Sequence, residues 1–382
     1  MKVVVVDITS RNAEQYNPSL CKALAYNLPE GEVVLMAPDL YRKPKGFIFK
    51  RLINLLPKKW SASEAGWKRI IRAMESLLNY LYLIIYIAFS RPDILHIQWL
   101  PFIEFMSMEH GILSVIHFVN PKIKIVLTAH NIYPHNLSQK NKEEYQRRFK
   151  QLNNVINGYM VHLYSAKTEL ASEFDIHPEK IFVAYHGIYL PEGYSAKQNI
   201  ENGSYKRIIM FGTQNRYKGA DVLIEAMSLL PKGYQDKLKV TIMGKTEVGL
   251  YGDYIERARL LGVEWINKFV PDEELYQAIG ESDLILLPYR KISQSGVLLL
   301  ALSYRKPILT SDLPSFRETL EGYPKGYFFK PDNSQALADM LIQYLDGKID
   351  VKLLKNCINY LNSKYSWNES AKSTLVAYSN LI

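Results

Sequence analysis

Two glycine-containing turns in the second half of the chain carry the residue types that bind a phosphate group. The first turn, at 211–221, follows an apolar run and opens a helical pattern. Gly212 lets a ligand approach the backbone closely, while Arg216 and Lys218 offer a guanidinium fork and a compact ammonium charge. Asp221 could cap or charge-complement the start of the helix. Taken by itself, the same pattern also fits an ordinary strand-to-helix turn with solvated cations.

The second turn, at 287–298, also lies between an apolar run and an apolar helical pattern. The backbone N–H groups of Ser295, Gly296 and Val297 would point at an anion, assisted by the helix dipole. Ser295 by itself is more often simply a helix N-cap. Because both turns follow strands in the same half of the chain, they predict an anionic ligand held between them.

His130 is the candidate catalytic residue of the first half, because it follows an apolar run where a strand should end. A neutral imidazole can donate to a substrate hydroxyl, and a protonated one can stabilise an anionic leaving group. The alternative is a histidine with a purely structural role. His96 lies inside another apolar run and is expected to be a core residue.

The elements that must position these residues are two successive series of strands and helices. Runs this apolar, without polar alternation, are typical of strands buried on both faces of a parallel sheet. The polar, turn-rich segment 191–205 separates the two series and is the expected linker. Ligands of such sheets bind beyond the carboxyl ends of the strands, so we expect the site in a cleft between two lobes. The expected strands are 3–7, 33–37, 94–97, 125–129, 159–163 and 181–184, then 208–211, 240–243, 265–269, 284–287, 307–310 and 327–329.

The composition narrows the class of protein. A length of 382 residues suits two domains, and the two cysteines, Cys21 and Cys357, suit a reducing cytosol better than a disulfide framework. Residues 1–8 lack the pattern of a signal peptide. Residues 1–200 hold 24 Lys+Arg against 17 Asp+Glu, and this excess of seven makes up most of the net charge of +9. Nucleic acid is not an expected partner, because the basic residues do not lie on a recognised binding module.

Two segments of the first half have membrane-related patterns. The apolar run 77–89 has 13 residues, shorter than the roughly 20 that a spanning helix needs, and is expected to be a buried or interfacial helix. Segment 41–72 holds ten Lys+Arg and one acidic residue, Glu64, with aromatic and aliphatic residues between them. This pattern favours an interfacial helix on anionic lipid, with a solvated basic face as the alternative.

Three stretches of the second half resemble the donor-binding domain of the GT-B glycosyltransferases of family 4, the group 1 family. They read FGTQNRYKGADVLIEA, VPDEELYQAIGESDLILLPYRKISQSGVLLLAL and KPILTSDLPSFRE, and the first half is similar through DILHIQW, IVLTAHNIYPH and YHGI. The resemblance implies an α/β GT-B fold with two Rossmann-like doubly wound domains facing a central cleft. The expected divisions are an acceptor domain at 1–195, a donor domain at 206–364, and a C-terminal helix at 365–382 that packs back on the first domain.

The resemblance also implies roles for single residues. Arg216 and Lys218 would bind the donor diphosphate, and the turn at Ser295, Gly296 and Val297 would support it. His130 would contact the donor sugar. Further expected contacts are Phe269 and Val270 with the base, and Glu318 near the ribose or phosphate turn. On the acceptor side, Asn17 is the polar candidate of the first loop. Trp99 could stack on a sugar ring or serve only in packing, and His135 could contact the acceptor or be structural.

The sequence departs from the family pattern at the second turn. The family usually carries two glutamates seven residues apart there, and residues 292–300 contain neither. Thr213 also stands where the family often has its donor arginine, so Arg216 is expected to substitute for it. A carboxylate hydrogen bond to the ribose is therefore not guaranteed.

The expected activity is transfer of a hexose from a UDP- or GDP-linked sugar to a glycan or lipid-linked acceptor, in cell-envelope polysaccharide synthesis. No Asp-x-Asp triplet and no cluster with metal-ligand spacing occurs, so a metal-independent reaction with no further cofactor is expected. The resemblance implies retention at the anomeric carbon. The expected location is the cytoplasm, peripheral on the inner face of the membrane through 41–72. The alternatives are a sugar-nucleotide epimerase of the same fold and a non-catalytic membrane-surface binder with a decayed donor site.

Overall fold

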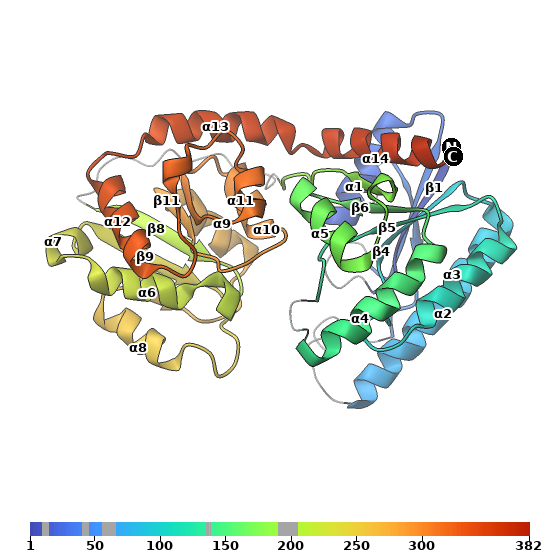
Figure 1. The fold of residues 1–382 in the computed structure, drawn as a ribbon, viewed down its shortest axis with the longest axis horizontal. Coiled ribbons are helices and arrows are strands. Elements are labelled where there is room, and N and C mark those ends of the chain that lie inside the picture. The colour runs from blue at the N-terminus through green and yellow to red at the C-terminus, as the bar shows by residue number, and fades with distance from the viewer. Residues whose placement is uncertain (10–14, 40–45, 56–65, 135–136, 138, 190–204) are drawn as a thin grey trace. The chain divides into compact units, whose positions relative to one another are not determined.

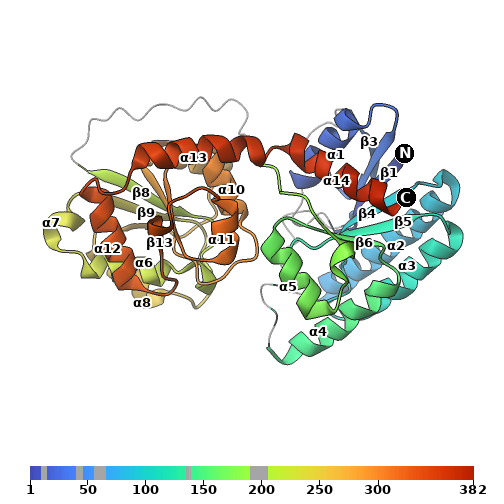
Figure 2. The same cartoon turned by 45° about the horizontal axis from the view of Figure 1, so that its top comes forward.

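The chain folds into two units in a computed structural model that describes residues 1–9, 15–39, 46–55, 66–134, 137, 139–189 and 205–382. Unit 1 comprises Met1–Gly187 together with Ser366–Ile382, and unit 2 comprises Ile188–Tyr365 (Figures 1 and 2). The expected linker lies outside the described residues except for Tyr205. Each unit has one sheet of parallel strands.

Unit 1 is built on a seven-stranded parallel sheet in the order β3-β2-β1-β4-β5-β6-β7. Alternate residues of β1 feed two separate cores, because Val4 and Val6 belong to one apolar cluster while Val3 and Val5 belong to the other. Such strands are buried on both faces, which explains their unbroken apolar sequences. The strands are β1 (Lys2–Asp7), β2 (Glu32–Ala37), β3 (Ile48–Arg51), β4 (Ile94–Trp99), β5 (Lys124–Thr128), β6 (Gly158–Val161) and β7 (Ile181–Val183).

Helices cover both faces of this sheet. One core contains residues of α1 (Tyr16–Asn27) and α14 (Trp367–Leu381), and these two helices lie side by side in Figures 1 and 2. The Tyr378 hydroxyl of α14 lies 2.6 Å from His96 Nδ1, in the middle of β4, so the end of the chain is tied into the centre of unit 1. The other core is covered by α2 (Gly66–Ser90), α3 (Met108–Val119), α4 (Gln139–Gln151) and α5 (Tyr164–Phe174).

The structure corrects two expectations for the first half. Segment 41–72 is not one interfacial helix, because Ile48–Arg51 is the edge strand β3 and α2 begins only at Gly66. The remainder of that segment up to residue 65 lies outside the described residues, apart from 46–47 and 52–55. The apolar run 77–89 is the second half of α2, which has 25 residues. The first half of α2 contains polar and charged residues, so the apolar run covers only its second half and underestimates the length of the helix.

Unit 2 repeats the plan with a six-stranded parallel sheet in the order β10-β9-β8-β11-β12-β13. The strand order reverses between β8 and β11, and ligands of doubly wound sheets bind at such a reversal. The expected strand 265–269 is shorter than predicted, because β10 ends at Ile266. The strands are β8 (Lys206–Phe211), β9 (Leu238–Met243), β10 (Glu264–Ile266), β11 (Leu284–Leu287), β12 (Ile308–Ser311) and β13 (Phe328–Phe329).

The helices of unit 2 connect these strands in regular alternation. The two that matter for the site are α6 (Ala220–Leu229), which follows the first glycine turn, and α10 (Gly296–Ser303), which follows the second. The others are α7 (Lys232–Gln235), α8 (Gly252–Leu260), α9 (Asp272–Glu281), α11 (Pro314–Thr319), α12 (Ser334–Leu345) and α13 (Val351–Lys364). Both glycine turns thus lie at the carboxyl ends of neighbouring strands, where the topology predicts a ligand.

Candidate functional site

The two glycine turns of unit 2 meet at Gly212, directly after β8. Its φ of +88° lies in the region that favours glycine, and a Cβ at this position would lie 2.6 Å from Lys218 Nζ. The same Cβ would lie 3.2 Å from Val297 Cγ2, at the start of α10. The structure therefore brings together Gly212 and Lys218 of the first turn and Val297 of the second, as the prediction of a shared ligand requires.

Lys218 is a buried cation, with 4% of its surface exposed. Its ammonium donates to the Phe211 carbonyl over 3.3 Å and lies 5.6 Å from the centre of the Tyr289 ring. Burial lowers the pKa of Lys218 to about 8. No described carboxylate contributes to this shift, so the charge is held beside the start of a helix without an anionic partner. A ligand phosphate would supply the missing charge.

At the second turn, Ser295 caps α10. Its hydroxyl accepts from the Leu298 amide over 3.1 Å, so this side chain serves the helix as the simpler interpretation predicted. The amides of Gly296 and Val297 belong to the first turn of α10, where a helix has no internal acceptor for them. The backbone of this turn, more than the Ser295 side chain, is therefore suited to an anion.

Arg290 connects the two turns, a role that no local sequence pattern indicated. Its guanidinium donates to the Arg216 carbonyl over 2.7 Å, and its amide donates to the Tyr217 carbonyl over 2.7 Å. It also forms a two-bond ion pair with Asp221, at 2.9 and 2.8 Å. Asp221 does not cap α6, whose N-cap is Gly219; it lies in the first turn of the helix and anchors Arg290 instead. Arg216 itself is exposed, in the short 3-10 turn Arg216–Lys218.

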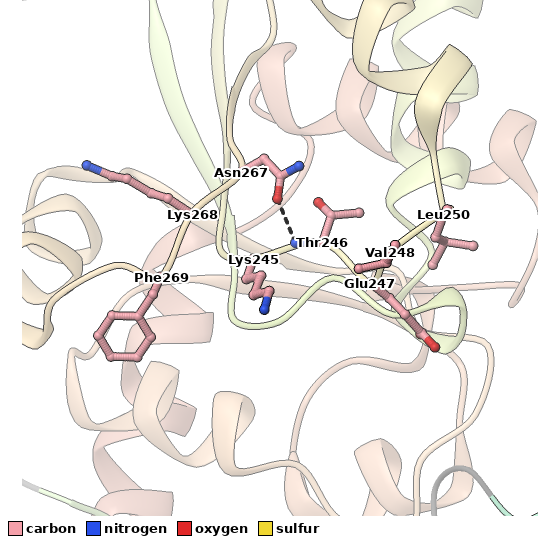
Figure 3. Close-up of a pocket in the computed structure, with 9 residues that line it drawn as sticks. Lys245, Thr246, Glu247, Val248, Leu250, Asn267, Lys268 and Phe269 are labelled. Atoms are coloured by element: carbon pink, nitrogen blue, oxygen red, sulfur yellow. Dashed lines mark hydrogen bonds between the residues drawn. The ribbon is translucent and has the colours of Figure 1, made fainter. Parts of the chain in front are cut away.

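A pocket of about 530 Å³ lies next to the first glycine turn, formed by the loops that follow β9 and β10. Phe269, the residue expected to meet the base, is part of its lining, with Phe269 at one end of the group in Figure 3 and Leu250 at the other. The Asn267 side chain accepts from the Thr246 amide over 2.8 Å and holds the two loops together. The Gln214 amide donates to the Lys245 carbonyl over 2.8 Å, which joins this pocket to the phosphate turn.

Glu318, the last donor-side candidate, lies in α11 and is half-buried. This helix contacts the second glycine turn, because the Ser315 hydroxyl donates to the Ile292 carbonyl over 2.7 Å. The helix that carries Glu318 is thus fixed to the phosphate turn. A contact of its carboxylate with a ribose stays a prediction.

In unit 1, His130 is one of three histidines at the carboxyl ends of neighbouring strands. His130 follows β5, His162 follows β6 and His186 follows β7. The His162 Nδ1 atom lies 2.9 Å from the Ala184 carbonyl, which can only accept, so Nδ1 carries the proton. In neutral His162, Nε2 is then an acceptor, and it lies 3.3 Å from His130 Nδ1. His130 therefore donates from Nδ1.

The other ring nitrogen of His130, Nε2, lies 3.0 Å from the Gln98 side-chain oxygen. With the proton on Nδ1 these two atoms are both acceptors, so they form a hydrogen bond only when Nε2 is protonated as well. Two aromatic rings contact His130: Trp99 stacks on it with ring centres 5.0 Å apart, and Tyr16 meets it in a T-shaped arrangement at 4.9 Å. Burial lowers the pKa of His130 well below its ordinary value, and the neighbouring histidines lower it further. The imidazole is thus neutral at pH 7 in this environment.

The acceptor-side candidates have different outcomes. Trp99 is brought next to His130. Asn17 is buried in α1, and its side-chain amide donates to Asp7 over 3.0 Å at the end of β1. His135 lies outside the described residues. Sequence analysis missed Tyr16, which contacts the rings of all three strand-end histidines. Among the residues that the structure describes, no three His, Cys, Asp or Glu side chains could together hold a metal ion.

The sequence and fold of the chain are similar to those of known glycosyltransferases. Residues 194–363 match the family model described as Glycosyl transferases group 1. This part of the chain is therefore similar to a group 1 glycosyltransferase domain. The GDP-mannose:glycolipid 4-beta-D-mannosyltransferase of Xanthomonas campestris pv. campestris is 24% identical over 231 residues, 58% of this chain and 61% of that protein. The amylovoran biosynthesis glycosyltransferase AmsK of Erwinia amylovora is 28% identical over 187 residues, 45% of this chain and 44% of its own length.

Solved structures extend the comparison to unit 1. A glycosyltransferase from Rickettsia africae aligns over 100% of this chain and 98% of its own, with a TM-score of 0.68 and 15% identity. Anabaena Alr3699/HepE in complex with UDP aligns over 98% and 100%, with a TM-score of 0.66 and 14% identity. The protein therefore has the predicted GT-B fold. The chain spans less than two thirds of the length of the mannosyltransferase named above, so the transferase activity of the whole protein stays a prediction. Its assignment to family 4 stays a prediction.

Proposed function

We propose that the protein transfers a hexose from a UDP- or GDP-linked sugar to a glycan or lipid-linked acceptor in cell-envelope polysaccharide synthesis. The observation that carries this proposal is the buried ammonium of Lys218, held between two glycine turns with no anionic partner among the described residues. The names of similar proteins agree with a nucleotide-linked donor and a lipid-linked acceptor. The Xanthomonas mannosyltransferase is named for GDP-mannose and a glycolipid, and Anabaena Alr3699/HepE was crystallised with UDP. No metal ion is needed in this proposal, and the anomeric configuration is retained.

In unit 2, the diphosphate would lie over the first glycine turn. Lys218 and the amides of Gly296 and Val297 would contact it from the protein side, and exposed Arg216 would close over it from solvent. The loops with Asn267 and Phe269 would take the base, because their pocket adjoins that turn. These groups together would stabilise the negative charge that develops on the leaving diphosphate.

His130 would act from unit 1 as an electrostatic stabiliser. Donation of a ring N–H to a sugar hydroxyl is the less favoured of its two possible roles, because the single ring proton of neutral His130 lies on Nδ1 and is already donated to His162 Nε2. A nearby diphosphate would raise the pKa of His130 and favour the imidazolium. That cation has an acceptor ready at each nitrogen, namely His162 Nε2 and Gln98 Oε1.

The test combines binding and turnover. Thermal shift with UDP, GDP and ADP should show stabilisation by UDP or GDP, and donor consumption in the presence of EDTA should require an acceptor extract. Lys218→Met should lose nucleotide affinity, whereas His130→Phe should keep affinity and lose turnover. Conversion of the donor without any acceptor would show an epimerase. Absence of stabilisation by any nucleotide would show a binding protein with a decayed donor site.

We also propose that the enzyme works in the cytoplasm as a peripheral protein on the inner face of the membrane. Cys21 and Cys357 are both free thiols in the structure, as suits a reducing compartment. Lipid-linked acceptors would be presented at that surface. Fractionation of cells should recover the protein with membranes at low salt and release it at high salt.

A further inference from the structure

Helix α2 has large apolar residues on its solvent side, in addition to a buried side that is partly polar. Its buried residues are Glu75, Ser76, Asn79, Tyr80, Leu83 and Ile87. Its solvent side carries large apolar residues at the three- and four-residue spacing of one helix face, namely Trp67, Ile70, Met74, Leu81, Ile85 and Phe89. A surface helix of a soluble protein normally shows solvent the opposite pattern. The outer face of α2 therefore needs a covering that the described chain does not provide.

The buried polar residues attach α2 to unit 1 along one side. The Asn79 side chain accepts from the Ile53 amide over 2.8 Å and donates to the Ile53 carbonyl over 3.0 Å. Glu75 accepts from the Leu55 amide. With 25 residues, α2 is long and apolar enough to cross a membrane. Every side of a membrane-spanning helix must contact lipid or other protein. The hydrogen bonds above hold one side of α2 against unit 1, so only its outer face is open to lipid.

Helix α3 continues the apolar surface. It packs beside α2, as Figure 1 shows, and exposes Val115 and Phe118, the latter with 84% of its surface. Phe105, just before α3, is also exposed. We call the six outward α2 residues named above, with these three, the α2–α3 face. Large exposed apolar side chains grouped on two packed helices in this way indicate an interaction site.

Charge around the α2–α3 face indicates the chemistry of its occupant. Lys68 and Arg69 lie at the first turn of α2, and Arg91 directly follows its last residue. The only acidic residue of α2, Glu75, is buried. An apolar strip with cations and a tryptophan at its edge is the pattern of a helix that lies in the interface of an anionic bilayer.

We propose that the α2–α3 face docks on an anionic lipid surface, with α2 lying along the membrane plane. A second copy of the chain is the less favoured occupant, because the cations at both ends of α2 would be brought close to the same cations of its partner. The docking surface lies in unit 1 and needs no residue of the donor site. This proposal gives a structural location to the proposed membrane association.

The test is vesicle flotation of the full chain with phosphatidylcholine alone and with phosphatidylcholine containing phosphatidylglycerol. Wild type should float with the anionic vesicles, and Trp67 fluorescence should shift to shorter wavelength. The Ile70→Glu/Ile85→Glu variant should bind at least tenfold more weakly. Leu229→Glu/Leu260→Glu, the same change at two exposed leucines of unit 2, should bind as wild type does. Lys68→Ala/Arg69→Ala should reduce the preference for anionic vesicles.

Several outcomes would overturn the proposal. Wild type that stays with the lipid-free fraction, or equal binding of wild type and the Ile70/Ile85 variant, would do so. A dimer in light scattering that the two glutamates dissociate would assign the face to a second copy. Protein that resists both salt and alkaline extraction would indicate a spanning helix. Nucleotide-induced stabilisation should be unchanged in the Ile70/Ile85 variant, so failure here is distinct from failure of the transferase proposal.

Discussion

At the scale of single residues, the donor side of the site depends on a lysine that is costly to bury. Most buried cations have an acidic partner, because leaving water is expensive for a lone charge. Lys218 has a carbonyl and an aromatic ring instead. The free-energy cost of burying the Lys218 charge lowers the pKa of this group. A bound phosphate would offset that cost by pairing with the ammonium. The position thus favours the liganded state over the empty one.

Nucleotide affinity should fall above pH 8, because the empty site loses the Lys218 proton there. With a pKa of about 8, the charged fraction decreases about tenfold for each further pH unit. Calorimetric titration with UDP or GDP from pH 7 to 9.5 measures this. In Lys218→Met the affinity should be low and nearly independent of pH, and a wild-type affinity that is flat to pH 9.5 would contradict the assignment.

The same group has the opposite effect on folding of the empty protein. The native state releases the Lys218 proton near pH 8, whereas the unfolded chain keeps it up to its ordinary pKa of 10.5. Between these values the unfolded state binds more protons, so the free energy of unfolding rises with pH, by about 3 kcal/mol in total. Wild type should gain stability relative to Lys218→Met over this window in urea titrations.

Gly212→Ala should damage both stability and nucleotide binding. The new Cβ would meet Lys218 Nζ and Val297, and the φ of +88° is unfavourable for alanine, so we expect a loss of about 1–2 kcal/mol. Displacement of the ammonium should weaken nucleotide binding at least tenfold. Gly233→Ala is the control, since its Cβ would meet nothing within 4 Å. Normal affinity in Gly212→Ala would separate this turn from the donor site.

At the scale of elements, the sequence predicted the parallel strands well, because strands buried on both faces must be apolar at every position. Val3 to Val6 show this directly. The site was predicted only where it is local: Gly212, Lys218 and Val297 lie in turns whose residue types are visible in short stretches. The bond from Arg290 to Asp221 spans 69 residues, and that from His130 to His162 spans 32, so no local pattern could reveal them.

The Arg290–Asp221 pair should couple the two glycine turns energetically. A double-mutant cycle with Arg290→Ala and Asp221→Ala should give a coupling of about 1–2 kcal/mol, because the pair has two bonds and is partly shielded from water. The exposed pair Lys232–Asp236 is the control, with an expected coupling below about 0.5 kcal/mol. Arg290→Ala should also weaken nucleotide binding. If the losses of stability in Arg290→Ala and Asp221→Ala simply add in the double variant, the Arg290–Asp221 ion pair does not contribute to stability.

At the scale of the whole molecule, the histidines are divided unevenly between the two units. All eight histidines lie between residues 96 and 186, in unit 1, and unit 2 has none. Burial lowers the pKa of His162 to about 4 and those of His96 and His186 to about 3. His130 is lowered as well. Unit 1 is therefore expected to respond to mild acid in a way that unit 2 cannot.

Unit 1 should lose stability as the pH falls from 6.5 towards 4. Over this range the unfolded histidines take up protons and the buried ones do not, at about 1.4 kcal/mol per histidine and pH unit. The three histidines with pKa values of about 3 to 4 together remove about 4 kcal/mol per pH unit, a large part of the stability of an ordinary domain, and His130 acts in the same direction. Limited proteolysis with mass spectrometry at pH 7 and 5 should show new cleavage in residues 1–187 first. Earlier cleavage in residues 206–364 would contradict the prediction.

Unit 1 is made of two pieces of chain, and this has a consequence for biosynthesis. The last helix, α14, supplies Ala371, Ala377 and Tyr378 to its interior, each at most 1% exposed. A ribosome translates the whole of unit 2 before it reaches these residues. The nascent first unit must therefore wait, with one sheet face partly uncovered, while the second can already fold. A stop codon after residue 365 would leave a finished unit 2 joined to a first unit that chaperones and proteases treat as incomplete.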